Sequence, residues 1–180
     1  MQAPHQPQPL TQMLTLRPMT VDDLSTARYI HAAAFKRAAP EYYAPEDIAA
    51  LVAFVRSPRY ADLLLGNHAI AAWMGTEMVG TGAWSPGEER SPTARILVLS
   101  VRPLFTGEGI GRQMLEHLEG QVRDNGFRAL EVAATLNTIG FFDSQGFRLV
   151  RQGPLALPLG HAFPVAYMRK SDFAGVQPKH

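Results

Sequence analysis

The sequence contains no cysteine, which excludes disulfide bonds, thiolate metal sites and a cysteine nucleophile. It has no apolar run that approaches the ~20 residues needed by a membrane-spanning helix. Its net charge is only +1, so we expect neither nucleic acid nor an anionic membrane surface as a partner. The N-terminus lacks a basic segment followed by an apolar run, so we expect no signal peptide and a cytoplasmic protein.

The composition is that of a folded domain. The 180 residues suit one domain with a sizeable core, and 46% of them are hydrophobic. The first twelve residues are rich in proline and glutamine, a composition that buries little apolar surface. We therefore predict a disordered tail over 1–12, one domain over 13–172 and a second tail over 173–180.

Apolar periodicity predicts a series of strands and helices. A first strand over 13–17 ends at Pro18, and a helix follows with Thr20 as its N-cap. A second helix begins at Pro45, because proline suits the first helical position. Two more helices are predicted, from Ile110 to about Asn125 and over 137–145. The other predicted strands cover 68–73, 78–84, 94–101, 129–134, 147–151 and 163–169.

The order of these elements is β-α-α-β-β-β-α-β-α-β-β. It predicts an α/β fold with a single mixed, mostly antiparallel sheet flanked by helices. A right-handed crossover through the third helix makes the strands on either side of it parallel. Pro154, Pro158 and Gly160 predict a longer loop between the last two strands.

The most informative segment is the turn between the strand over 94–101 and the next helix. Gly107, Gly109 and Gly111 stand at alternate positions there, and Arg112 follows them. Glycines allow close backbone approach, and the start of a helix offers unpaired N–H groups, so the turn suits a phosphate. The alternative is a glycine-rich turn without a ligand. The spacing matches neither the dinucleotide fingerprint nor the nucleoside-triphosphate loop, although a nucleotide binder of another class stays open.

Two segments resemble the GNAT superfamily of N-acetyltransferases. The first runs from Val101-x-Pro103 through Gly107-x-Gly109-Ile110-Gly111 to Met114-Leu115, and is similar to that family's acetyl-coenzyme A motif. The second, Phe141-Phe142-x-x-x-Gly146-Phe147, resembles the family's F-Y-x-x-x-G-F segment. Leu16-Arg17-Pro18 and Asp23 are similar to its usual start, so the resemblance covers about residues 14 to 170.

The resemblance implies that acetyl-coenzyme A is a co-substrate and that an amine attacks its thioester directly. It implies that backbone groups of Leu99, Ser100 and Val101 pair with the pantetheine arm, and that an N–H there polarises the thioester carbonyl. It also implies a pyrophosphate site in the glycine turn. The residues implied there are Thr106, Gly107, Glu108, Gly109, Ile110, Gly111 and Arg112.

Three positions depart from the family pattern. Thr106 stands where the family has Gln or Arg, and Thr135 stands where many members have Asn, a role that Asn137 is placed to take. Phe142 occupies the position of a Tyr that protonates the leaving thiolate in many members. A general acid contributes roughly 10²–10⁴-fold, but a thiol with a pKa near 8.5 leaves fairly well without one.

The loss of the acid leaves two interpretations. Water, Tyr167 or Ser144 donates the proton in an active N-acetyltransferase. Alternatively, the chain binds acetyl-coenzyme A and catalyses slowly or not at all.

The acceptor is not identified by the sequence, which allows a small-molecule or a protein amine. Glu41, with Tyr42 and Tyr43, is a candidate for binding a cationic amine and accepting its proton, the alternative being packed tyrosines in a helix connection. We predict a structural role for His31, and no metal site, because no histidines have metal-ligand spacing. The balanced charge argues against a polyamine or histone-like acceptor. Dimers are common in the family, so a homodimer stays open.

Overall fold

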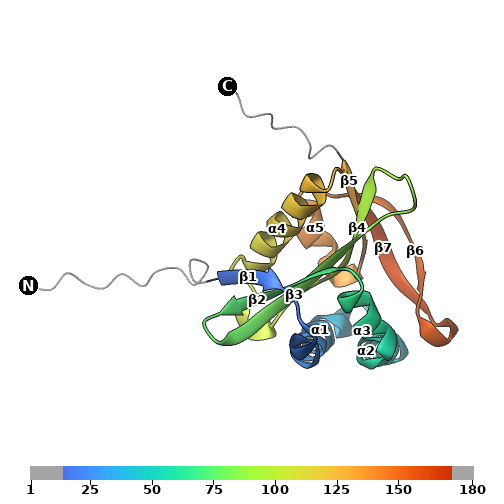
Figure 1. Cartoon of the computed structure of the whole chain (residues 1–180). Coiled ribbons are helices and arrows are strands. Elements are labelled where there is room, and N and C mark those ends of the chain that lie inside the picture. Colours follow the sequence, from blue (N-terminus) through green and yellow to red (C-terminus); the bar gives the residue numbers. More distant parts are fainter. Residues whose placement is uncertain (1–13, 172–180) are drawn as a thin grey trace, which may run out of the picture.

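The computed structural model describes residues 14–171, which form one seven-stranded sheet with helices on both faces (Figure 1). The strand order is β1-β2-β3-β4-β5-β7-β6, and only β4 and β5 pair in parallel, which confirms the predicted fold class. The predicted tails lie outside the described residues. The strands are β1 (Leu14–Pro18), β2 (His68–Met74), β3 (Glu77–Pro86), β4 (Thr93–Val101), β5 (Ala129–Ala134), β6 (Arg148–Ala156) and β7 (Ala162–Ser171).

The helices divide between the two faces of this sheet (Figure 1). α4 (Ile110–Asp124) and α5 (Ile139–Ser144) cover one face, and α1 (Leu24–Ala38), α2 (Pro45–Arg56) and α3 (Pro58–Leu65) cover the other. Three apolar clusters result: one lies under α4, one lies under α1 and α3, and one joins α1 and α2 to β7. Across residues 14–171, no helix is long and apolar enough to cross a membrane.

α3 is a helix that the sequence analysis does not predict. Ser57 is its N-cap and accepts a hydrogen bond from the backbone N–H of Tyr60, and Pro58 occupies the first helical position. Proline at the first helical position is the same start signal that identified α2. The start of α3 is hard to recognise in the sequence because α2 ends at Arg56, directly before the Ser57 cap.

The predicted loop around Pro154 is wrong, because β6 continues through that residue to Ala156. Pro154 lies opposite Pro164 of β7. β6 is the edge strand, where a missing N–H donor costs little. Before Ala166, β7 pairs only with β6 and not with β5, so Pro164 interrupts only a two-stranded ribbon.

A β-bulge in β4 shapes the middle of the sheet. Ala83 and Trp84 of β3 lie opposite Val98 and Ile96, so Leu97 is an extra residue. Pairing between β4 and β5 ends at the same point, with Ile96 opposite Val132. The carboxyl half of β4 therefore separates from β5.

Two glycines of β3 bring α4 close to the sheet. A Cβ atom on Gly80 would lie 2.6 Å from the Met114 sulfur, and one on Gly82 would lie 3.1 Å from Leu118. This close packing places the first turn of α4 beside the end of β4.

Candidate functional site

A cavity of about 780 Å³ passes through the sheet where β4 and β5 separate. The carboxyl halves of both strands line its middle. Its lining continues to the glycine turn and α5 on one face of the sheet, and to α1, α2, α3 and the β6–β7 ribbon on the other. A single space therefore connects the two faces.

The glycine turn forms one end of the cavity. After a short 3₁₀ turn, η4 (Pro103–Phe105), Gly107 and Gly109 adopt the left-handed region with φ of 88° and 76°. Gly109 is the N-cap of α4, so the unpaired N–H groups of the first helical turn begin beside it. These donors and the positive end of the helix dipole suit an anion.

The space above the first turn of α4 depends on Gly111. A Cβ atom on Gly111 would lie 3.6 Å from the Phe141 ring and 3.7 Å from Val101. A methyl group fits, but a longer side chain would fill the space between α4, β4 and α5. The residue therefore keeps a cradle open for a ligand.

All the residues predicted to bind the cofactor line this cavity, except Glu108. Glu108 is exposed between two glycines of the turn. Leu99, Ser100 and Val101 lie in the part of β4 that has separated from β5. Arg112 is exposed, with its Nε 3.9 Å from a Glu116 oxygen, a loose surface pair that leaves its charge near the turn.

Asn137 contributes a buried polar atom to the same side of the cavity. It lies in a 3₁₀ turn, η5 (Leu136–Thr138), and within the described chain its Oδ1 is buried without a hydrogen-bond partner. Buried polar atoms are normally paired, so this atom marks a place for a polar ligand group. The glycine cradle and Asn137 both fit a ligand with phosphate and amide groups.

His31 and Tyr60 lie in the other half of the cavity. The Nδ1 atom of His31, on α1, is 2.7 Å from the hydroxyl oxygen of Tyr60, on α3. Burial lowers the pKa of His31 to about 4, and it raises the pKa of Tyr60. Both side chains are therefore neutral near pH 7.

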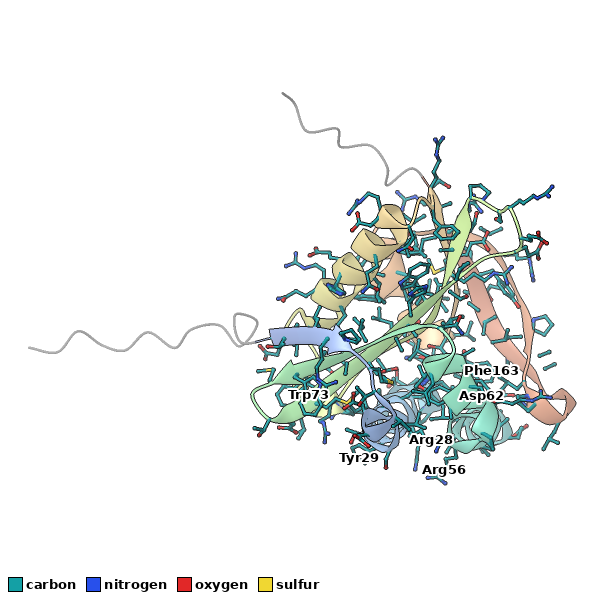
Figure 2. The ribbon with its side chains drawn as sticks, in the orientation of Figure 1. Arg28, Tyr29, Arg56, Asp62, Trp73 and Phe163 are labelled. Atoms are coloured by element: carbon teal, nitrogen blue, oxygen red, sulfur yellow. The ribbon has the colours of Figure 1, made fainter. Side chains whose placement is uncertain are left out.

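Apolar side chains from five elements, α1, α2, α3, β6 and β7, complete this half. Phe163 of β7, labelled in Figure 2, points toward α1 and α2. Its ring stacks on Tyr43 at 4.8 Å between ring centroids and meets Phe35 of α1 edge-on at 5.9 Å. The Nε2 atom of His161 lies 2.7 Å from Asp47 of α2, which fastens the β6–β7 loop to the helices. Leu157, at the start of this loop, lines the cavity.

The family model for the acetyltransferase (GNAT) family matches residues 25–147, which is most of the described chain. The chain belongs to the GNAT family. Membership supports an acetyl-coenzyme A-dependent acyltransferase. A search of the curated proteins finds no match.

Solved structures share this GNAT fold. A GCN5-related N-acetyltransferase from Rhodopseudomonas palustris superposes with a TM-score of 0.77 at 23% identity, over 87% of this chain and 94% of that one. The PaiA N-acetyltransferase of Thermoplasma acidophilum, solved with coenzyme A, has a TM-score of 0.69 at 16% identity, over 88% of this chain and 98% of that one. A GNAT acetyltransferase from Brucella melitensis, solved with acetyl-coenzyme A, has a TM-score of 0.59 at 21% identity, over 92% of each chain.

Phe142, which the resemblance assigns to the position of the acid, brings no hydroxyl to the cavity. It is 4% exposed, lines the cavity, and packs against Phe141 and Phe147 with centroids 5.2 Å away in each case. Two donors considered for the leaving thiolate lie elsewhere. The hydroxyl of Tyr167 donates to Pro154 O at 2.8 Å, that of Ser144 donates to Phe141 O at 2.6 Å, and neither lines the cavity.

Glu41 and its two tyrosines do not gather in this GNAT cavity. Glu41 is exposed in a 3₁₀ turn, η3 (Ala39–Glu41), Tyr42 is half-exposed, and neither lines the cavity. Tyr43 is buried, and its hydroxyl donates to Pro164 O at 2.8 Å and accepts from Leu136 N at 2.8 Å. Tyr43 thus joins the α1–α2 connection to η5 and β7.

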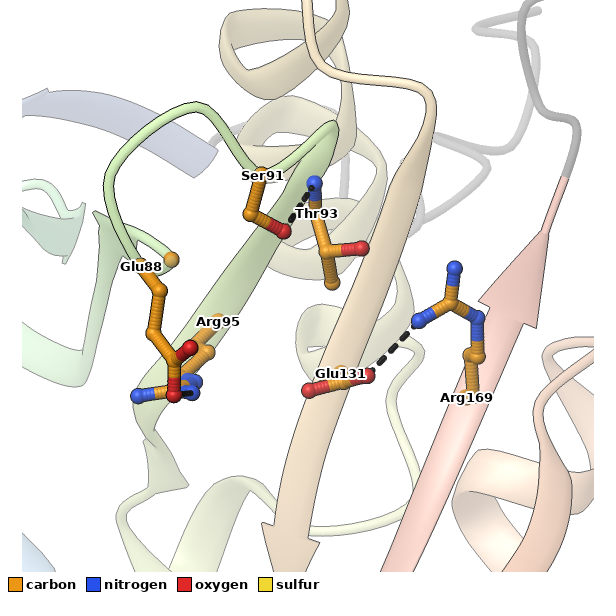
Figure 3. A pocket seen from close by; sticks show the side chains of 7 residues that line it. Glu88, Ser91, Thr93, Arg95, Glu131 and Arg169 are labelled. Atoms are coloured by element: carbon orange, nitrogen blue, oxygen red, sulfur yellow. Dashed lines mark hydrogen bonds and ion pairs between the residues drawn. The ribbon is translucent and has the colours of Figure 1, made fainter.

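A second, smaller hollow of about 300 Å³ lies at the opposite end of β4 and β5 (Figure 3). Its charged groups already pair with one another. Arg169 lies 2.7 Å from Glu131, and Arg95 lies 3.6 Å from Glu88. It has neither a free charge nor an apolar wall for a ligand, so we assign function to the larger cavity.

Proposed function

We propose that this GNAT protein transfers the acetyl group of acetyl-coenzyme A to the nitrogen of an amine by direct attack. The observation that carries the proposal is the single cavity through the sheet, with a glycine turn suited to phosphate on one face and an apolar compartment on the other. Two substrates entering from opposite faces would meet at the separated end of β4. The coenzyme A and acetyl-coenzyme A bound in two fold neighbours support this choice of donor.

On the donor face, the backbone N–H groups from Gly107 to Arg112 would hold the pyrophosphate. The separated half of β4 would pair with the pantetheine amides as an added strand does. Asn137 Oδ1 would accept a hydrogen bond from one of those amides, which satisfies its buried oxygen.

Acetyl-coenzyme A supplies an activated thioester. The chain's part is to hold that thioester beside Leu99–Val101, where a backbone N–H stabilises the developing oxyanion. Walls of apolar side chains exclude water from the same place. Positioning of both reactants is the larger share of the catalysis that this cavity offers.

The sequence predicts a structural role for His31, but because it lines the cavity we give it a functional one: on the acceptor face, it would accept a hydrogen bond from the attacking nitrogen. Tyr60 fixes the orientation of its ring through the 2.7 Å contact. The burial that keeps His31 neutral also disfavours an ammonium ion, so the cavity selects the neutral, nucleophilic form of the amine.

A second candidate function is a non-catalytic acetyl-coenzyme A-binding module. The buried Phe142 ring favours it, because the position of the expected acid has no proton to give. We favour the enzyme because a thiolate leaves without strong acid help.

Calorimetric titration with acetyl-coenzyme A, with coenzyme A, ATP and NAD as comparisons, tests the donor site. We expect binding of the two coenzyme A forms and weak or absent binding of the nucleotides. Gly111→Leu should weaken binding by about 10-fold or more, because the side chain fills the cradle. Gly120→Leu on the same helix, where a Cβ meets nothing within 4 Å, is the matched control. The proposal would be rejected if Gly111→Leu and Gly120→Leu lost the same affinity for acetyl-coenzyme A. It would also be rejected if the unchanged protein did not bind acetyl-coenzyme A.

A further inference from the structure

The acceptor half of the cavity, which we call the acceptor compartment, is apolar. Its walls come from α1, α2, α3, β6 and β7. Six of the side chains that shape it are Phe35, Leu51, Phe54, Leu157, Phe163 and Val165. An acceptor that fills this compartment must itself bury an apolar group, which contributes roughly 25 cal/mol for each Å² removed from water.

No carboxylate lines any part of the cavity in the described chain. A second positive charge on the acceptor would therefore be buried without a counter-ion, which is strongly unfavourable. This excludes polyamines, aminoglycosides and lysine-rich tails on local grounds, independently of the chain's net charge.

One cation stands in the acceptor compartment. Arg37 lies in the last turn of α1 and lines the cavity, and in the part of the chain that the structure describes it has no hydrogen-bond or ion-pair partner. Its neighbour Lys36 is also exposed but does not line the cavity. A guanidinium group presents two parallel donors that match a carboxylate.

His31, Ala34, Phe35 and Ala38 recur at helical spacing and form one wall, with Arg37 at its edge. Arg37 lies six residues after His31, which is about 9 Å along the helix axis. Its long side chain leans back toward the N-terminus of α1. An amine beside His31 and an anion beside Arg37 can therefore belong to one small molecule.

We propose that the acceptor is a hydrophobic amino acid, whose apolar side chain fills the acceptor compartment and whose carboxylate binds Arg37. This proposal rests on the acetyl transfer proposed above. The amine nitrogen forms a bond to the acetyl carbon, and the bond from that carbon to sulfur breaks. The nitrogen loses one proton, coenzyme A leaves as its thiol, and the product is an N-acetylamino acid that keeps its negative charge.

The test measures thiol release from acetyl-coenzyme A with L-phenylalanine, L-leucine, phenethylamine and spermidine. We expect kcat/KM to be highest for the two amino acids. Arg37→Met should lower kcat/KM for phenylalanine by about 10-fold, the lower end for a hydrogen-bonded charge because this site is exposed. The same variant should leave kcat/KM for phenethylamine unchanged, because this amine lacks the carboxylate. Lys36→Met is the matched control and should alter kcat/KM for neither phenylalanine nor phenethylamine.

Three outcomes would overturn the inference: a preference for spermidine, equal effects of Arg37→Met on phenylalanine and phenethylamine, or no product with any of the four amines. Calorimetry with coenzyme A, run on the same preparations, separates this failure from failure of the donor site. A protein that binds coenzyme A but fails these tests has a different acceptor. A protein that does not bind it fails at the proposed function itself.

Discussion

The Nδ1 atom of His31 lies 2.7 Å from the hydroxyl oxygen of Tyr60, and both groups face the cavity in neutral form. Because burial holds the pKa of His31 at about 4, this imidazole does not titrate between pH 5 and 8. The pair is a fixed hydrogen-bonding unit over that range.

We predict that kcat/KM rises with pH toward the pKa of the acceptor's own ammonium group, with no inflection near 6.5. His31→Gln should lower kcat by about 10-fold or more, since it removes the ring that contacts the nitrogen. His117→Gln, an exposed histidine on α4, should have no effect. An inflection near pH 6.5 that His31→Gln abolishes would contradict the neutral pair.

The lowered pKa of His31 also affects the stability of the fold. His31 takes up its proton in the unfolded chain near pH 6.5 and in the folded chain only near 4. The free energy of unfolding should therefore fall as pH drops through this window, and His31→Gln should remove part of that dependence. Urea denaturation of both proteins at pH 7 and pH 4.5 measures this change in the free energy of unfolding.

Phe142→Tyr is expected to raise kcat by about 10-fold, because it restores an acid at the family position. The hydroxyl would enter the cavity beside Phe141, so Phe141→Tyr serves as the control for an added hydroxyl alone. Steady-state thiol release is the measurement. If Phe142→Tyr only lowers activity, the leaving thiolate needs no acid there, and the non-catalytic candidate loses its support.

Tyr43→Phe should lower the free energy of unfolding by about 1–3 kcal/mol, because it leaves the Leu136 N–H buried without its acceptor. Burial raises the pKa of Tyr43 to about 12, so the bond persists at all ordinary pH values. Urea denaturation tests this expectation. The half-exposed Tyr42 allows a matched Tyr42→Phe variant, and equal stability of the two proteins would refute the bridging role.

Asp23→Asn should lower the melting temperature by several degrees. Asp23 receives two hydrogen bonds from Arg17, at 2.8 and 3.0 Å, and one from Thr20 N at 2.9 Å. Burial alone would raise the pKa of Asp23, but these bonds outweigh it and hold the pKa below 3.8. The stabilisation is thus present above pH 3.8 and lost as pH falls through the lower folded value. Asp22→Asn, on the exposed neighbour, should melt as the unchanged protein does.

The donor side of the cavity was predictable because its signals are local. Three alternate glycines and a helix start lie within six residues of one another, and their backbone geometry determines what they bind. The parallel pairing of β4 and β5 followed in the same way from the helix between them.

The acceptor side could not be predicted, because its residues come from five elements and look like core positions in sequence. Phe35 and Phe163 are separated by most of the chain, and nothing local distinguishes them from other buried rings. The spacing of His31 within α1 indicates a helix face but not which partner it meets. The carboxylate of Glu41 next to two tyrosines predicts an amine site, but the fold leaves Glu41 on the surface.

The bulge at Leu97 gives the protein an internal sheet edge. An unpaired strand edge on a protein surface invites another chain to pair with it, which promotes aggregation. Here the edge lies in the cavity between helices on the two faces of the sheet, and a slender ligand with its own amide groups would fit beside it. The complex with acetyl-coenzyme A would then be the completed sheet, and amide hydrogen exchange from residue 97 to residue 101 should slow when that ligand binds.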